Sequence, residues 1–242
     1  MKVVALISGG KDSCFNMMKC VDNGHKVVCL ANLYPSEGDE LDSYMYQTVG
    51  HNAVELYGEA CDLPLLRRPI RGKPINTDLN YKIEGDDEVE DLFELLTEVK
   101  ARYPDVEGVS VGAIMSEYQK IRVENVCSRL NLDVLCYLWN SNQASLLDEM
   151  IALNLKAILI KCACSGLSEK HLGKDIAEVR DLLHELHNMY GVNICGEGGE
   201  YETLVLDCPF FKHKIVLDAA ESFCDSTLCF FYVLREMHLE KK

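Results

Sequence analysis

The sequence predicts an α/β protein in which a Rossmann-like parallel sheet is followed by a second, smaller α+β domain. Three observations lead to this fold class. Short apolar runs alternate with amphipathic helical patterns from residue 2 to about residue 140. A glycine-rich turn, SGGKDS, separates the first apolar run from the first helical pattern. Beyond residue 140 the chain changes in character and includes a long helical pattern and a glycine-rich acidic stretch.

The first βαβ unit covers residues 2–33. Residues 2–7 (KVVALI) form a short apolar run typical of a buried parallel strand, and residues 26–33 (KVVCLANL) form a second. Between them, residues 14–22 have apolar side chains at helical spacing, and Asn23-Gly24 is a typical helix end. Such units form right-handed crossovers, and their sheets bind ligands beyond the carboxyl ends of the strands. We therefore expect SGGKDS at the ligand-binding edge.

The later elements follow the same patterns. Residues 88–103 form the clearest helix, because their apolar side chains recur every three or four residues. In the first part we also expect helices over residues 42–59 and 117–130 and strands over residues 65–68, 108–112 and 134–139. In the second part we expect helices over residues 146–155 and 175–190 and strands over residues 157–163, 214–217 and 228–234. No linker marks the boundary, and we place the domains at residues 1–133 and 134–242.

The chain carries a strong negative charge. Its 24 lysine and arginine residues face 39 aspartate and glutamate residues, which gives a net charge of -15 over 242 residues. Proteins that follow a nucleic-acid backbone usually have a basic surface, so the charge argues against a nucleic-acid partner. The acid-dense stretches 37–42 and 84–94 are interpreted as a solvated loop and the outer face of a helix. An acidic surface that prefers a basic partner is the alternative.

The cysteine pattern and the hydropathy predict a cytoplasmic protein without a membrane partner. None of the 12 cysteines forms a C-x-x-C pair, so zinc-ribbon, iron–sulfur and thioredoxin-like sites lack their usual spacing. Most cysteines lie in apolar segments, where they behave as small hydrophobic side chains. No apolar run approaches the roughly 18 residues of a membrane span. The apolar start is cut off by Ser8 and is too short for a signal peptide.

The stretch Ser8-Gly-Gly-Lys-Asp-Ser13 has the composition of a phosphate-binding turn. Two glycines permit a tight turn that brings N–H groups close to an anion, and the following helix directs its positive end there. Ser8 and Ser13 add hydroxyl groups, Lys11 adds a positive charge, and Asp12 is a candidate magnesium ligand. The stretch is not the nucleotide loop G-x-x-x-x-G-K-[ST], whose spacer it lacks. The alternative interpretation is a plain strand-to-helix turn.

A second polar stretch, GAIMSEYQKIRVE at residues 112–124, follows another expected strand. Gly112 ends that strand, so the chain can pass close to a nucleotide there. Polar side chains then gather at the start of a helix and are candidate substrate ligands. They are Ser116, Tyr118, Gln119, Lys120 and Arg122. Lys120 and Arg122 are two residues apart and do not share one helix face fully, so both need not be ligands. A solvated helix is the alternative.

The third stretch is GEGGEYET at residues 196–203, which places three glycines and three glutamates within eight residues. Glu200 and Glu202 repel one another unless a cation or a proton is present. No histidine is adjacent, which weakens an interpretation as a metal site. Tyr201 among carboxylates suits a quaternary ammonium group, through cation–π attraction and charge. The alternative is an acidic turn on the surface.

SGGKDS resembles the pyrophosphate-binding loop, S-G-G-x-[DS]-S, of the N-type ATP pyrophosphatases, the PP-loop superfamily. Its members cleave ATP between the α and β phosphates and form an adenylated intermediate. The resemblance implies a sheet of the adenine nucleotide alpha hydrolase-like (HUP) type, with ATP and Mg²⁺ bound at its edge. It implies catalytic roles for Lys11 and Asp12, with Mg²⁺ on Asp12. The residues implied to bind ATP or pyrophosphate are Ser8, Gly9, Gly10, Lys11, Ser13, Ala31, Leu33 and Gly112.

The three stretches, together with DSYMYQTVGH at residues 42–51, are similar to the branch of this superfamily that completes diphthamide synthesis. The similarity runs from residue 2 to about residue 218 and includes YLW at 137–139, KHLGK at 170–174 and LDCP at 206–209. It implies amidation of the diphthine carboxylate on elongation factor 2 with ammonium and ATP. The products would be diphthamide, AMP and pyrophosphate, formed through an acyl adenylate.

The same resemblance implies roles for the acidic stretch. Diphthine has a trimethylammonium group beside its reacting carboxylate, and Glu197, Glu200, Tyr201 and Glu202 would hold that cation. One carboxylate would also bind ammonium and take its proton, and Glu200 is the candidate for this catalytic role.

Two departures from the branch and two other functions stay open. The segment after Asp218 is expected to be short, with a terminal strand lost or rebuilt, and Cys162-Ala-Cys164 replaces small apolar residues. The first alternative function is a PP-loop enzyme that modifies tRNA, against which the negative charge and the lack of C-x-x-C count. The second, from another class, is a nucleotide-sensing binding module of the universal-stress type. The oligomeric state is also open.

Overall fold

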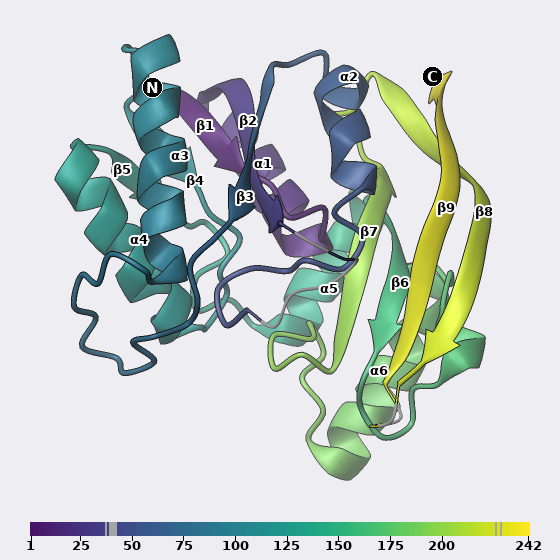
Figure 1. Ribbon diagram of the computed structural model, residues 1–242. Helices are drawn as coiled ribbons and strands as arrows, with labels where there is room; N and C mark the ends of the chain where they lie inside the picture. Colours follow the sequence, from purple (N-terminus) through teal and green to yellow (C-terminus); the bar gives the residue numbers. More distant parts are fainter. Residues whose placement is uncertain (37, 39–42, 226, 228) are drawn as a thin grey trace.

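The chain builds two sheets, each with its own helices (Figure 1). The computed structural model describes residues 1–36, 38, 43–225, 227 and 229–242. The first sheet has five parallel strands in the order β3-β2-β1-β4-β5. They are β1 (Lys2–Leu6), β2 (Lys26–Pro35), β3 (Leu65–Ile70), β4 (Gly108–Ser110) and β5 (Asp133–Leu135). The strand order changes direction next to β1, which confirms the Rossmann-like sheet.

Helices cover both faces of the first sheet. They are α1 (Lys11–Asp22), α3 (Glu88–Arg102) and α4 (Glu117–Leu130), and between β2 and β3 lie the short η1 (Ala53–Leu56) and α2 (Tyr57–Cys61). On one face, buried side chains of α3 and α4 pack with those of the strands, such as Val4 and Val109. On the other face, α1 contributes the buried Phe15 and Met17 to a second apolar cluster.

The second sheet has four antiparallel strands in the order β7-β6-β9-β8. Its elements are α5 (Gln143–Ala152), β6 (Lys156–Cys162), η2 (Glu169–His171), α6 (Ile176–Tyr190), β7 (Tyr201–Asp207), β8 (His213–Cys224) and β9 (Phe230–Lys241). Phe15 of α1 belongs to the same apolar cluster as Leu159 and Leu204 of this sheet. The expected second α+β unit is confirmed, and it shares its core with α1 of the first unit.

Local sequence explains where the long helices begin and end. The Asp87 carboxylate caps α3 by accepting from the Val89 N–H (3.0 Å), and Asp175 forms a capping box with Glu178 at the start of α6. Gly191 follows α6 with φ 71°, a left-handed conformation that glycine adopts at little steric cost. Both helices therefore lie within one residue of their expected bounds.

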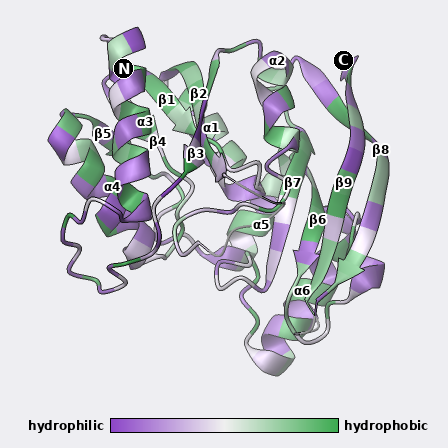
Figure 2. Cartoon of the chain, viewed as in Figure 1, coloured by the Kyte–Doolittle hydropathy of each residue, from purple (hydrophilic) through white to green (hydrophobic). Residues whose placement is uncertain are grey.

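Hydropathy follows the arrangement of the sheets (Figure 2). The strand β1 lies at the centre, and its residues Val3, Val4 and Ala5 are fully buried. Residues 218–224 of β8 extend past the core and are exposed or half-buried. In the part of the chain that the structure describes, no helix has the length and apolar content needed to cross a membrane.

The helix expected over residues 42–59 is wrong. Residue 42 lies outside the described residues, residues 43–52 have no regular structure, and helical turns begin only at η1. The cause is the buried Glu88, whose carboxylate accepts from the Ser43 hydroxyl (2.6 Å) and from the Met45 N–H (3.2 Å). These bonds fix an irregular course against α3. Local apolar spacing cannot reveal a partner 45 residues away in the chain.

Two expectations about later segments also need correction. The strand expected over residues 134–139 is shorter than predicted. It corresponds to β5, which ends at Leu135 and pairs with β4 in the first sheet, and residues 137–140 form turns. The terminal strand is not lost, because β9 pairs with both β8 and β6 inside the second sheet. The start of the strand expected at residue 228 lies outside the described residues. The domain division at residue 133 stays a prediction, and it passes through β5.

Candidate active site

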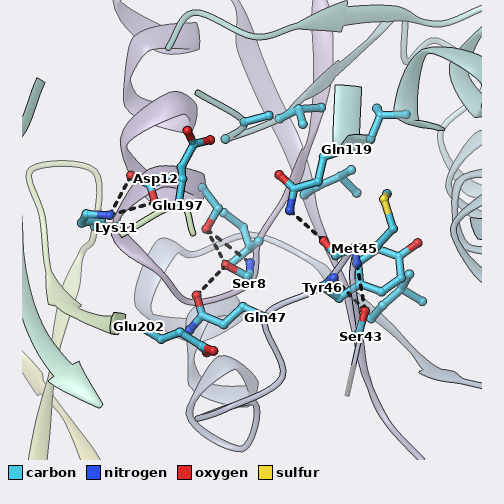
Figure 3. A pocket seen from close by; sticks show the side chains of 18 of the residues that line it. Ser8, Lys11, Asp12, Ser43, Met45, Tyr46, Gln47, Gln119, Glu197 and Glu202 are labelled. Carbon is cyan, nitrogen blue, oxygen red and sulfur yellow. Dashed lines mark hydrogen bonds and ion pairs between the residues drawn. The ribbon is translucent and has the colours of Figure 1, made fainter. Parts of the chain in front are cut away.

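A cavity of about 490 Å³ opens at the carboxyl ends of β1, β2 and β4, beside β7 of the second sheet (Figure 3). Side chains of α3 and α4 line one side of it. The other lining residues come from the segments 6–13, 31–33, 43–47, 111–113 and 195–203. Open α/β sheets bind their ligands at this position, and the volume is that of a small-molecule site.

The SGGKDS stretch forms the turn between β1 and α1, and its hydroxyl groups fold back onto its own backbone. Gly9 has φ +96°, which a side chain would strain. The Gly10 N–H donates to Ser8 Oγ (3.2 Å), and the Ser8 N–H donates to Ser13 Oγ (3.3 Å). N–H and hydroxyl groups therefore converge at the start of α1, an arrangement that suits the oxygens of an anion.

Strand β7 fastens the same turn from the other side. Thr203 Oγ1, which is buried, accepts from the Lys11 N–H (3.0 Å), the first N–H of α1. The Val205 N–H donates to the Gly9 carbonyl (2.8 Å). The buried Tyr57 hydroxyl lies between the carbonyls of Gly9 (3.0 Å) and Val205 (2.6 Å). Both sheets therefore build the SGGKDS turn, residues 8–13, which we call the phosphate loop after the ligand predicted for it.

Lys11 is only 2% exposed, and its ammonium lies beside the Asp12 carboxylate. The ammonium donates to both Asp12 carboxylate oxygens (3.0 and 2.9 Å) and to the Cys195 carbonyl, and it lies 5.3 Å from the centre of the Tyr201 ring. Burial lowers the pKa of Lys11, but the Asp12 carboxylate together with Tyr201 and Cys195 outweighs this, and the pKa lies above its ordinary value. A fixed positive charge therefore stands beside the phosphate loop, and it occupies the face of Tyr201.

Gly112 lies close to the backbone at the start of α1. A Cβ atom at residue 112 would lie 2.6 Å from the Ser13 nitrogen and 2.7 Å from the Asp12 carbonyl carbon. Backbone atoms cannot move aside as a flexible side chain can, so only glycine fits. The glycine expected to admit a nucleotide also lets the loop after β4 pack on the phosphate loop.

We call residues 196–200 together with the start of β7 the acidic loop. Two of its glutamates line the cavity. Glu197 Oε1 accepts from the N–H groups of Ile114 (2.8 Å) and Met115 (2.9 Å), in the loop after β4. Glu202 pairs with Lys161 of β6 (3.2 Å). Each carboxylate is thus anchored on a different element, and together they form an acidic part of the cavity wall, the acidic wall.

Glu200 is not among the described residues that line the cavity. Its Oε1 accepts from the Asn193 N–H (3.1 Å), while its buried Oε2 has no hydrogen-bond partner in the described part of the chain. Both oxygens lie close to Gly198, where a Cβ atom would be 2.9 Å from each. A buried carboxylate oxygen without a partner is costly, so Oε2 is suited to meet a cation or a proton.

Of the polar residues expected at the start of α4, Gln119 alone lies among the described residues of the cavity wall. Its Nε2 donates to the Met45 carbonyl (3.0 Å). Ser116 caps α4 by accepting from the Gln119 N–H (3.3 Å), and Lys120 pairs with Glu124 (2.9 Å). Ser116 and Lys120 therefore stabilise α4 and do not reach the cavity in this structure.

Arg122 and Tyr118 also lie behind the cavity wall. Arg122 is fully buried, and its guanidinium carbon lies 3.3 Å from the centre of the Tyr118 ring. The guanidinium donates to the carbonyls of Asn76 and Asp78 (2.9 Å to the latter). Since its donors hold the segment before α3, the structure places Arg122 in a supporting position.

Several lining residues were missed by sequence reasoning, among them Asn32, Ser43, Gln47 and Thr203. The Gln47 amide donates to the Thr203 carbonyl (3.0 Å), and a side chain at Gly10 would overlap it. A signal was present for two of them. Gln47 lies in the polar stretch 42–51, which was interpreted as helix, and Thr203 ends the acidic stretch.

Comparison with known proteins places the chain in a family. A family model described as diphthamide synthase N-terminal domain matches residues 1–134, and one described as diphthamide synthase C-terminal domain matches residues 142–239. The chain is 58% identical to the diphthine–ammonia ligase of Homo sapiens over 252 residues, covering 100% of this chain and 94% of the human protein. The chain belongs to the diphthine–ammonia ligase family. The resemblance seen in the sequence is confirmed.

Other members of the diphthine–ammonia ligase family match over different shares of their length. The protein of Rattus norvegicus is 58% identical over 252 residues, covering 100% of this chain and 94% of that protein. That of Saccharomyces cerevisiae is 50% identical over 231 residues, covering 88% of this chain and 34% of the yeast protein. Among solved structures, a predicted subunit of tRNA methyltransferase from Methanocaldococcus jannaschii is 13% identical with a TM-score of 0.38, covering 86% of this chain and 98% of that chain.

Proposed function

We propose that the chain amidates the diphthine carboxylate of elongation factor 2 with ammonium and ATP, yielding diphthamide, AMP and pyrophosphate. The family supports the overall reaction, since its curated members are named diphthine–ammonia ligase. One structural observation supports the finer steps. The phosphate loop and the acidic loop line a single cavity, and the Lys11 ammonium joins them through the Cys195 carbonyl. Residues suited to bind an anion and glutamates suited to attract a cation therefore line the same cavity.

The proposed chemistry has two steps. A carboxylate oxygen of diphthine attacks the α-phosphorus of ATP, the bond between that phosphorus and the bridging oxygen breaks, and pyrophosphate leaves. Ammonia then attacks the carbonyl carbon of the acyl adenylate, and the bond to the AMP oxygen breaks. Negative charge grows on the leaving pyrophosphate in the first step. The N–H and hydroxyl groups of residues 8–13 and the Lys11 ammonium are positioned to stabilise it.

Asp12 fits a role in holding Mg²⁺. Its carboxylate lines the cavity, is 28% exposed, and has lone pairs beyond those that Lys11 uses. Mg²⁺ sites often take one or two protein carboxylates and fill their other positions with phosphate oxygens and water. Within the described ranges, no group of three or more His, Cys, Asp or Glu is placed to hold a metal ion. When bound, Mg²⁺ would supply further neutralisation of phosphate charge.

The remaining partners are assigned by position and charge. Ala31 and Leu33 line the cavity at the end of β2, where we place adenine. Glu197 and Glu202 supply negative potential for the trimethylammonium group of diphthine. Glu200 Oε2 is assigned to ammonium, from which it takes the proton that must leave before nitrogen can attack.

Substitutions at Glu197 separate its negative charge from its role as a hydrogen-bond acceptor. In Glu197→Gln the amide oxygen still accepts from the two N–H groups after β4, but the charge is lost. We expect a KM for ATP within about twofold of wild type and a KM for the diphthine substrate raised about tenfold, roughly 1.4 kcal/mol. Glu197→Ala should raise both KM values, because the N–H groups lose their acceptor. Kinetics with each substrate varied in turn measure this. Unchanged KM values in Glu197→Gln would show that the charge is not used.

The proposed function is tested with the purified chain, ATP, ammonium and elongation factor 2 isolated from cells that stop at diphthine. We expect release of one AMP and one pyrophosphate per amide, with the amide read by mass spectrometry of the modified peptide. Unmodified elongation factor 2 is the matched control. Pyrophosphate release with bulk tRNA but not with the diphthine-bearing protein would overturn the proposal in favour of a tRNA-modifying enzyme.

A further inference from the structure

Exposed apolar side chains gather beside the cavity. In the described part of the chain, twelve large apolar side chains are exposed, and five of them lie on segments that line the cavity or pack against its wall. We call these five the apolar rim: Tyr44 (61% exposed), Ile75 (48%), Leu79 (54%), Ile83 (57%) and Met115 (52%). Scattered apolar side chains are normal on a protein surface, but a group of them beside a ligand site indicates contact with another molecule.

Aromatic contacts connect the rim to the cavity. Tyr44 lines the cavity and is also the most exposed residue of the rim. Its ring lies 6.0 Å from that of Tyr118 on α4, and the Tyr118 ring lies against the buried Arg122. Met115 lies in the loop that Glu197 anchors, directly before α4. These contacts link Tyr44 at the cavity, through Tyr118 and Arg122 of α4, to the segment that carries the other rim residues.

The segment that carries most of the rim is held in a defined course. Arg122 donates to the carbonyls of Asn76 and Asp78, and its guanidinium lies 5.2 Å from the centre of the Tyr81 ring. The Asn76 N–H donates to Asp87 Oδ2 (3.0 Å). A buried guanidinium that uses its donors on loop carbonyls stabilises one conformation of that loop. The exposed apolar side chains of residues 75–83 are thus presented on an anchored segment.

We propose that the apolar rim is the surface on which elongation factor 2 docks next to its diphthine residue. This inference rests on the proposed function. The acceptor of the amide is one side chain of a large folded protein, and a cavity of about 490 Å³ admits a side chain but not the protein that carries it. The protein must therefore rest on the mouth, and the rim begins at the mouth with Tyr44.

The charges around the rim indicate an apolar contact. The exposed charged residues of segment 71–86 are Arg71, Lys73, Asp78, Lys82, Glu84 and Asp86. They balance one another, whereas the whole chain has a net charge of -15. The overall charge attracts the cationic diphthine residue over a distance and is sensitive to salt. The rim itself is suited to uncharged apolar side chains beside diphthine, and its contribution to binding should persist in salt.

The double variant Ile75→Ser/Leu79→Ser tests the docking surface. Both side chains are about half exposed, so the fold should be retained. We expect the KM for diphthine-bearing elongation factor 2 to rise about tenfold or more, as for central residues of an interface. The kcat, the KM for ATP and the salt dependence of the reaction should stay unchanged. The matched control is Val21→Ser/Leu153→Ser, whose side chains are 39% and 38% exposed and lie at the ends of α1 and α5. It should match wild type.

Each other outcome decides against the inference in a different way. An unchanged KM in the rim variant, with an active wild type, overturns the docking surface and leaves the proposed function intact. A wild type that does not amidate diphthine overturns the function and the inference together. Sedimentation tests a second copy of the chain as the occupant. A wild-type dimer that the rim variant converts to monomer would assign the rim to self-association and overturn the inference.

Discussion

Lys11→Ala is expected to abolish AMP formation without unfolding the protein. The Lys11 ammonium is a buried positive charge beside the phosphate loop, held by Asp12 and the Cys195 carbonyl. Removing it takes away the charge that we assign to the leaving pyrophosphate, and it leaves Asp12 to repel the same group. Loss of one such preorganised group costs about 10²- to 10³-fold in kcat, roughly 3–4 kcal/mol. Pyrophosphate release with the diphthine-bearing substrate measures it.

Lys19 provides the matched control for Lys11. It lies on the same helix, but its ammonium pairs with Glu149 at the surface, away from the cavity. Lys19→Ala should therefore keep the wild-type rate, and its surface ion pair contributes at most about 1 kcal/mol to the stability of the fold. Thermal unfolding of both variants shows whether the fold survives. A Lys11→Ala variant that forms AMP at close to the wild-type rate would remove Lys11 from the proposed mechanism.

Glu200→Gln is expected to slow amide formation about 10²-fold or more, the range for loss of a positioned general base, with little effect on ATP affinity. The amide oxygen of Gln can still accept from the Asn193 N–H, so the acidic loop keeps its anchor. What is lost is the negative charge on the buried Oε2, the atom to which we assign ammonium. Exchange of labelled pyrophosphate into ATP reports the first step alone and should continue in the variant. Ligation at limiting ammonium reports the second step and should fail.

Glu185 is the control for Glu200, because it is an exposed glutamate on α6. Glu185→Gln removes the same charge from the molecule and should leave both steps unchanged. If Glu200→Gln instead ligates ammonium at the wild-type rate, Glu200 is not the proton acceptor. If pyrophosphate exchange is lost as well, the residue acts on the phosphate loop and the division of labour proposed here is wrong.

The parallel sheet and the phosphate loop could be predicted because their signals are local. Residues 2–33 contain a strand, the SGGKDS turn, a helix and the next strand within one short stretch. The helix expected over residues 175–190 is also confirmed, and the structure shows that local residues set its ends: the capping box at Asp175 and Gly191. In each case the residues that decide the structure lie within a few positions of one another.

The course of segment 43–47 and the roles of side chains in α4 and the acidic loop could not be predicted, because contacts with residues far away in the sequence determine them. Segment 43–47 is held by Glu88, and no local pattern announces that contact. The start of α4 reads as a row of polar ligands, but packing turns Arg122 inward to hold the Asn76 carbonyl. The acidic loop reads as three equivalent carboxylates. Only the fold shows their different surroundings: Glu197 accepts from two N–H groups, Glu202 pairs with Lys161, and Glu200 has a buried oxygen without a hydrogen-bond partner in the described part of the chain.

The bond between the Lys11 N–H and Thr203 Oγ1 also bears on how the protein is made. It joins residues 192 positions apart. The phosphate loop therefore emerges early from the ribosome, but it can form this hydrogen bond only after β7 has been synthesised. Until then the first helix has an open amino end, and its apolar side chains Phe15 and Met17 lack the partners that the second sheet supplies. A fragment that stops at residue 134 would contain the SGGKDS motif but not Thr203 and Val205 of β7, which hold it. We therefore expect the proposed ATP site to be completed only late in synthesis, together with the loop that we assign to its substrate.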